Sequence, residues 1–278
     1  MGVQNKNSRI FHYLWGRIQF EHKKILMLNR ITSAILVVSA IVFGSLVAHS
    51  GDFVYFSPAK EFIELDAYAI AGTSNVIQNY SSEFPQIQNL SVNMGASLGL
   101  GARAVFGFRE YLGLGTSLNL MVNNYSVDMA VLGSDNRSMS SVYIDNQFYS
   151  LNIPVFMSFR FNIDKSVRWV VDGGFYYAYG FAGTQKQHIY RAEMNAMNEL
   201  VPQLVSIKTD YFHSHETFIN SFNRGDIGLH LATQVNFGPH FIVGIQYQLG
   251  LKNSSQTNGI NNPSVHNQYL HAKVGYRF

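Results

Sequence analysis

The 278-residue chain contains no cysteine and few charged residues. Without cysteine it can form neither a disulfide framework nor a thiolate metal site. Only 13% of its residues are charged, against about 25% in an average soluble domain. Tyr, Phe and Trp together reach 14%. This composition fits a protein embedded in a cell envelope better than a cytosolic enzyme.

A strict alternation of apolar with small or polar residues marks the stretch Val92–Val122. A period of two predicts β-strands, because successive side chains point to opposite faces of a strand. Two such runs joined by a tight turn predict an antiparallel hairpin. The apolar positions are Val92, Met94, Ala96, Leu98, Leu100, Ala102, Ala104 and Phe106, then Leu112, Leu114, Leu118, Leu120 and Val122.

The second face of this hairpin indicates where the sheet lies. In a soluble sandwich that face would carry water-exposed residues such as Lys, Glu and Thr. Here it is mostly Gly, Ser and Asn with one Arg, which suits a narrow lumen. Both runs also exceed the roughly 9 to 11 residues that a tilted strand needs to cross a bilayer. The pattern is typical of a membrane barrel, apolar outside and polar inside.

Six further segments alternate in the same way, so eight strands are expected. The connections between them alternate between long and short, as in outer-membrane barrels with long outer loops and tight periplasmic turns. The sequence therefore predicts an all-β fold, a transmembrane eight-stranded antiparallel up-and-down β-barrel over residues 62–278 with both ends periplasmic. The expected strands lie near 62–71, 92–106, 112–122, 150–161, 168–181, 227–237, 241–252 and 270–278, and the first three long loops near 73–91, 128–146 and 183–223.

Two details of these segments carry separate predictions. Pro154 lacks a backbone donor, so we expect a local bulge in its strand. Within the longest connection, apolar residues recur at spacings of three and four, which predicts a short amphipathic helix interrupted at Pro202. That helix would cap the barrel mouth, lie on its rim or dock a partner. Its apolar residues are Tyr190, Met194, Met197, Val201, Leu204 and Val205.

The first 50 residues resemble a secretory signal with a long leader. Basic residues precede the apolar run Ile31–Ala48, and Ala48-His49-Ser50 offers a cleavage site. A retained membrane anchor is the alternative, and Met27 competes with Met1 as the initiator. Residues 51–61 would then be a periplasmic segment. Residues 1–50 contain six of the 20 Lys/Arg and one of the 17 Asp/Glu. The rest of the chain therefore has 14 basic and 16 acidic residues, a net charge of −2. With this charge, no nucleic-acid partner is expected.

Three short motifs carry a family resemblance. They are Asn152-Ile153-Pro154, Asp172-Gly173-Gly174-Phe175-Tyr176 and the terminal Gly275-Tyr276-Arg277-Phe278. With the barrel pattern, they make the chain similar to the Bacteroidetes outer-membrane β-barrel domain family, which includes the PorT-like proteins. The resemblance implies a place in the outer membrane of a Gram-negative bacterium and recognition of Phe278 by the barrel assembly machinery. Members include porin-like proteins of unknown role and an accessory factor of type IX secretion.

Charged residues of both signs fall on the inward face of the expected strands. Because an unpaired buried charge is costly, they should pair, and eight strands leave an interior that side chains can fill. We expect a plugged polar lumen rather than a conducting pore, although the inward glycines would also permit a small cavity. The expected lumen cluster comprises Glu64, Asp66, Arg103, Arg160, Asp172, His230, His271, Lys273 and Arg277, with Arg168 nearby.

An enzyme is the second class of function that the sequence leaves open. His213, His215 and Glu216, with His188 nearby in sequence, could orient a nucleophile or bind a metal at the outer rim. They lack further ligands at a recognised spacing, and no Gly-x-Ser-x-Gly motif occurs. We therefore expect no enzymatic activity, no cofactor and no metal.

The sequence thus favours a structural or partner-binding barrel, with an accessory of protein secretion as one such role. The expected partners are membrane lipids and a protein bound through the extracellular loops. A narrow porin or carrier of small solutes is the alternative, and a hydrolase at the extracellular rim is a second one.

Overall fold

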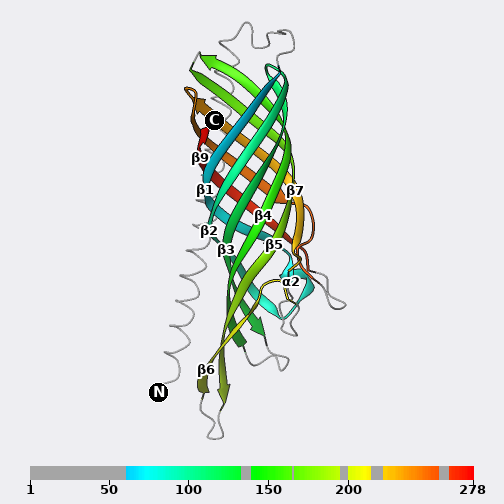
Figure 1. Cartoon of the computed structure of the whole chain (residues 1–278). Helices are drawn as coiled ribbons and strands as arrows, with labels where there is room; N and C mark the ends of the chain where they lie inside the picture. Colours follow the sequence, from blue (N-terminus) through cyan, green and yellow to red (C-terminus); the bar gives the residue numbers. More distant parts are fainter. Residues whose placement is uncertain (1–60, 133–138, 165, 195–199, 214–221, 257–262) are drawn as a thin grey trace. The chain divides into compact units, whose positions relative to one another are not determined.

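The structure, a computed structural model, describes residues 61–132, 139–164, 166–194, 200–213, 222–256 and 263–278. The expected signal, residues 1–50, and nearly all of the segment 51–61 lie outside these ranges. The described chain is almost entirely strand, with one short helix, α2 (Tyr80–Glu83) (Figure 1). The strands are β1 (Phe62–Gln78), β2 (Ile87–Arg109), β3 (Leu112–Leu132), β4 (Met139–Asp164), β5 (Val167–Met194), β6 (Leu200–Asp210), β7 (Gly225–Phe237), β8 (Phe241–Gly250) and β9 (Val265–Arg277).

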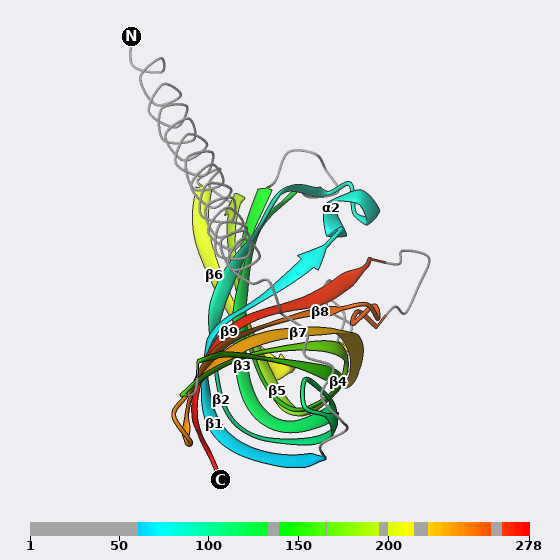
Figure 2. The same ribbon diagram turned by 90° about the horizontal axis from the view of Figure 1, so that it is seen from above.

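Eight of these strands close into a ring. Each pairs antiparallel with two neighbours: β1 with β2 and β9, and β5 with β4 and β7. The remaining strand, β6, pairs only with the far part of β5 and stays outside the ring. The ring is visible when the sheet is seen from above (Figure 2). The predicted eight-stranded antiparallel barrel is confirmed. In the described part of the chain, no helix is both long and apolar enough to cross a membrane.

The burial pattern of the ring is the reverse of that in a soluble protein. On β1, Ile63 is 74% exposed, whereas the next residue, Glu64, is 5% exposed. Because lipid replaces water around a membrane barrel, apolar side chains face outward and polar ones inward. The predicted faces are confirmed along the eight strands except at the start of β2, where a register shift between Met94 and Ser97 turns Val92 towards the inward apolar core. Outward apolar residues include Leu65, Leu100, Leu118, Leu120, Val155, Phe175, Leu231, Ile245 and Val274.

The two faces of β3 exchange their polarity partway along the strand. Up to Val122 the outward residues are mainly leucine, and the inward ones include Asn119 and Asn123. From Asn124 to Asp128 the outward residues are polar, whereas the inward residues Tyr125, Val127 and Met129 are apolar and buried. The strand continues without interruption. The outward face of the first part of β3 therefore suits contact with lipid, and the outward face of the second part suits contact with water.

The same exchange occurs on β4 and β5. Outward Tyr149 is followed along β4 by Gln147 and Asp145, and outward Phe181 is followed along β5 by Thr184 and Lys186. Beyond these points the sheet encloses an apolar core, beside which the amides of Asn146, Gln185 and Gln187 stay buried and bonded to one another. On the other side of these points, before the faces exchange, the outward side chains are apolar. We call that part of the outer face the lipid band. The apolar core contains Val76, Tyr80, Ile87, Tyr125, Val127, Met129, Ile144, Phe148, Tyr211, Phe212, Phe222, Val265 and Tyr269.

This exchange explains why the predicted loops were too long. Most of the expected loops 73–91 and 128–146 are strand, because β1 continues to Gln78, β2 begins at Ile87, and β3 and β4 extend to Leu132 and from Met139. Polar residues on the outer face of strands that leave the bilayer look like loop residues in sequence. Strands β2 to β5 are 21 to 28 residues long, against 10 to 13 for β7 to β9, so one side of the barrel projects much further.

The predicted helix between Tyr190 and Val205 is wrong. Strand β5 continues to Met194, and β6 returns from Leu200, paired with it from Met194↔Leu200 to Thr184↔Asp210 (Figure 1). Cross-strand pairing satisfies the backbone groups that a helix would satisfy internally. Pro202 would break a helix, but an edge strand tolerates it. The short helix lies instead in the β1–β2 connection, as α2.

The predicted bulge at Pro154 is also wrong. Pro154 pairs with Tyr176 on β5, and the register with β3 is the same on both sides of it, from Thr116↔Val155 to Asn119↔Asn152. A proline can omit a ladder hydrogen bond without adding a residue. The register shifts on the β4–β5 ladder occur at Tyr149/Ser150 and Asn162/Asp164 instead.

The position of the exchange predicts unequal effects of one substitution at two sites on the outer face of β3. Leu118→Arg should destabilise the folded barrel by about 2–4 kcal/mol, because it puts a charge near the middle of the lipid band. Asn124→Arg should have little effect, because that position faces water. Urea titration of refolded protein in lipid vesicles measures both. Equal destabilisation by the two substitutions would contradict the assigned boundary.

Candidate functional site

The lumen is crossed by one buried arginine. Arg103 on β2 donates from Nε and Nη2 to both carboxylate oxygens of Asp172 on β5, at 3.1 and 2.9 Å. It also donates from Nη1 to Asp66 on neighbouring β1, at 3.0 Å, and from Nη2 to Ser158 on β4, at 2.9 Å. All four residues are at most 5% exposed. A guanidinium group suits this place because its planar fork can bind a carboxylate through two parallel bonds.

A third carboxylate, that of Glu64, joins three arginines near the end of the barrel where short turns connect the strands. We call this end the short-turn end. Glu64 Oε1 lies 2.6 Å from Arg160 Nη2, 3.2 Å from Arg168 Nη1 and 2.9 Å from Arg277 Nη1. Arg277 also donates from Nε to Asp66, at 3.0 Å, which links this group to Arg103. We call the whole set the ionic network: Glu64, Asp66, Arg103, Arg160, Arg168, Asp172 and Arg277.

Aromatic rings fill the lumen next to the ionic network. The ring of Tyr68 lies against the bare backbone of Gly101, and that of Phe156 against Gly115, where a Cβ atom would collide with each ring. The inward glycines therefore make room for rings rather than leaving space open. Tyr68 also donates its hydroxyl to Asn119, at 2.8 Å, which holds its ring across the lumen.

Amides and histidines form the next layer. His230 Nδ1 lies 3.0 Å from Gln248 Nε2, and Gln248 is bonded to Asn152. His271 contacts Gln246 at 3.2 Å and Ser97 at 2.8 Å. These bonds satisfy polar groups that lie out of reach of lipid and mostly out of reach of water.

The nine residues proposed for the lumen cluster all lie inside the barrel, each at most 9% exposed. Six of them form ion pairs with one another: Glu64, Asp66, Arg103, Arg160, Asp172 and Arg277. His230 and His271 belong to the amide layer, and Lys273 lies over the ring of Tyr68 at 5.4 Å. Sequence reasoning missed the rings of Tyr68 and Phe156, because an inward aromatic among glycines gives no separate signal.

The two ends of the lumen differ. At the short-turn end a hollow of about 830 Å³ is lined by residues that include Phe62, Arg160, Arg168 and Arg277. At the long-loop end the apolar core closes the interior, with Phe148 and Tyr211 stacked at 4.9 Å. Two spaces beside this core measure about 20 Å³ each, room for about one water molecule. Burial in the apolar core raises the pKa of the hydroxyl group of Tyr80, in α2, to about 12.

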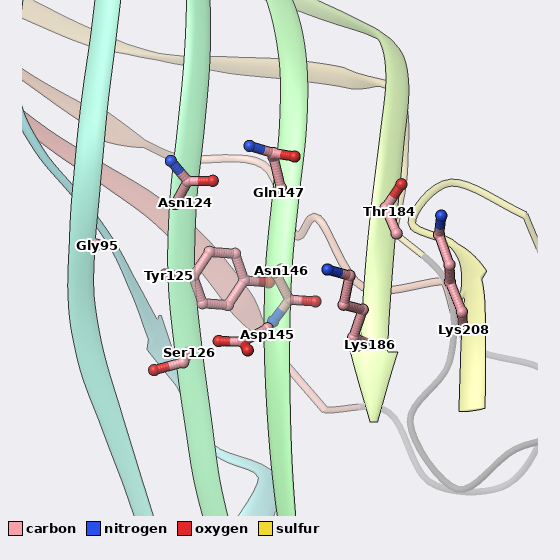
Figure 3. A pocket seen from close by; sticks show the side chains of 10 residues that line it. All are labelled: Gly95, Asn124, Tyr125, Ser126, Asp145, Asn146, Gln147, Thr184, Lys186 and Lys208. Carbon is pink, nitrogen blue, oxygen red and sulfur yellow. The ribbon is translucent and has the colours of Figure 1, made fainter. Parts of the chain in front are cut away.

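A second hollow, of about 450 Å³, lies on the outer surface beyond the lipid band (Figure 3). We call it the outer hollow. Strands β2 to β6 all contribute to it, so it spans the projecting side of the barrel. Its lining comprises Gly95, Asn124, Tyr125, Ser126, Asp145, Asn146, Gln147, Thr184, Lys186 and Lys208.

The histidine-rich segment considered for catalysis is only partly described. His215 and Glu216 lie outside the described residues, and His213 follows the end of β6. His188 lies on β5, with its Nδ1 2.9 Å from the hydroxyl of Ser206 on β6. Within the described ranges, no three His, Asp or Glu side chains are grouped so that they could hold a metal ion.

The ionic network predicts a large stability effect at its centre. Arg103→Met should lower the free energy of unfolding by about 3–5 kcal/mol, because it leaves two buried carboxylates without their partner. Arg109→Met, at the exposed end of the same strand, should change it little and serves as the control. Denaturant titration in detergent micelles measures both. Equal stability of the Arg103 variant and the wild type would show that the pairing is unimportant.

Comparison with solved structures finds several bacterial outer-membrane barrels. The attachment invasion locus protein Ail of Yersinia pestis, in complex with a heparin analogue, is 13% identical over 78% of this chain and 99% of its own, with a TM-score of 0.34. OprG of Pseudomonas aeruginosa is 9% identical over 79% and 96%, with a TM-score of 0.32. The protease OmpT of Escherichia coli is 9% identical over 82% and 99%, also with a TM-score of 0.32.

The family comparison is decisive. The model of the outer membrane protein β-barrel domain family matches residues 68–256, which is most of the barrel. No curated protein matches the chain. With the closed ring, the lipid band and the polar interior, this match places the protein in the outer membrane. The chain belongs to the outer membrane protein β-barrel domain family.

Proposed function

We propose that this protein is a non-conducting outer-membrane barrel that serves a structural or partner-binding role. The observation that supports this proposal is that side chains of several strands meet across the lumen in successive layers. Arg103 bridges opposite sides of the ring through Asp172 and Asp66. Tyr68 and Phe156 fill the next layer, and the apolar core follows at the long-loop end. An eight-stranded barrel has little interior space beyond what side chains occupy.

The projecting strands supply the partner-binding part of the proposal. Strands β2 to β5 with β6 form a sheet that extends beyond β7 to β9 and turns polar residues outward (Figure 1). Such a surface needs no lipid and is available to a protein partner. An accessory role in protein secretion, which the PorT-like resemblance suggested, belongs to this proposal, and affinity capture of native partners would identify the partner. We propose no catalytic role.

A narrow porin is the second candidate. The observation in its favour is the hollow of about 830 Å³ at the short-turn end, lined by three arginines. Such a vestibule could admit a small anion. For passage, however, the ionic network and the rings beyond it would have to separate.

Planar-bilayer recording distinguishes the two candidates. The purified barrel should give no steady unitary currents, because its lumen is filled. Tyr68→Ala combined with Phe156→Ala and Arg103→Ala should create small currents, because it removes the two rings that lie against Gly101 and Gly115 and the arginine that crosses the lumen. This variant is the positive control for insertion. Steady currents from the wild-type protein would overturn the non-conducting proposal in favour of the porin.

A further inference from the structure

The outer hollow lies at the depth of the lipid headgroups. On β4 its residue Gln147 is the next outward position after Tyr149, an exposed aromatic of the lipid band. Outward neighbours on a strand are about 7 Å apart. The hollow therefore begins within about 7 Å of the band. The long-loop end of such a barrel faces the exterior, so the nearest lipid headgroups are those of the outer leaflet.

The outer hollow is lined by two ammonium groups, those of Lys186 and Lys208, and by one carboxylate, that of Asp145. Lys186 on β5 lies directly opposite Lys208 on β6, an arrangement that is destabilising by itself. Among the described residues, neither ammonium group makes an ion pair within 4.0 Å. Figure 3 shows both side chains at the hollow, on neighbouring strands.

Three carboxylates lie near these lysines, and each already accepts a hydrogen bond. Asp145, opposite Lys186 on β4, accepts from the hydroxyl of Tyr143 at 2.8 Å. Asp128 accepts from Asn93 at 3.0 Å, and Asp210 accepts from the backbone of Phe212 at 2.7 Å. None of these carboxylates forms an ion pair within 4.0 Å of either ammonium group in the described residues, so both ammonium groups can contact a bound anion.

The rest of the lining suits sugar hydroxyl groups. Asn124 and Gln147 offer amides, and Ser126 and Thr184 offer hydroxyls. Such groups can both donate and accept hydrogen bonds, as sugar hydroxyls also do. Asn124 donates to the carbonyl of Ala96 at 3.0 Å, which leaves its side-chain oxygen as an acceptor.

We propose that the outer hollow binds the sugar–phosphate headgroup of an outer-leaflet glycolipid, with its phosphate between Lys186 and Lys208. The closeness of the hollow to the lipid band favours a ligand anchored in the bilayer over a diffusing protein. The site lies outside the ring, so it goes beyond the proposed closed lumen. Loss of this site would leave the conductance result unchanged.

The test compares two double variants of the full chain that lose the same charge. Lys186→Gln with Lys208→Gln removes the proposed phosphate contacts. Arg191→Gln with Lys252→Gln removes two exposed cations that do not line the hollow. Titration with labelled rough lipopolysaccharide micelles should show affinity about tenfold or more weaker for the hollow variant and unchanged for the control. Heat-dependent gel mobility checks that each barrel is folded.

Several outcomes would overturn the proposal. They are no binding by the wild type, equal affinities of the wild type and the hollow variant, or equal losses in the two double variants. If phosphatidylglycerol vesicles displace labelled lipopolysaccharide as effectively as unlabelled lipopolysaccharide does, recognition of the sugar would be overturned. If the hollow variant fails to fold, Lys208→Gln alone provides the test, because β6 lies outside the closed ring.

Discussion

The inability of lipid to form hydrogen bonds is the constraint on which the whole structure depends. Every backbone group within the bilayer must be paired by the protein itself, so the eight strands close into a ring. The same constraint drives charged and amide side chains inward, where water is also scarce. There they can be stable only by bonding to one another. The bridge from Asp66 through Arg103 to Asp172 follows directly from this requirement.

Where the strands leave the lipid, the constraint ends and the faces exchange roles. Outward side chains then meet water, and the inward ones form an ordinary apolar core around Tyr125, Phe148 and Tyr211. This core occupies the interior of the described barrel at the outer end. The exchange also brings Lys186 and Lys208 to the surface just beyond the lipid band. A single change of environment along the strands thus accounts for the apolar core, the projecting sheet and the outer hollow.

Much of the barrel could be predicted from sequence because its signal is local. Alternation identified all eight ring strands and placed residues such as Arg160 and His271 on the inward face. Pairing across the lumen could not be predicted, since Glu64 and Arg160 are 96 residues apart and no local pattern links them. The extensions of β3 and β4 were read as loops because their polar face lies outside. The outer hollow depends on the register of β6 against β5, where the spacing of apolar residues suggested a helix instead.

Depth measurement along one strand tests this account most directly. Because the chain has no cysteine, single substitutions such as Leu118→Cys, Leu120→Cys, Asn124→Cys and Ser126→Cys can each carry one spin label on the outer face of β3. In lipid vesicles, labels at 118 and 120 should be relaxed mainly by oxygen, and those at 124 and 126 mainly by a water-soluble nickel chelate. A uniform response at all four positions would contradict an exchange of polarity between residues 122 and 124.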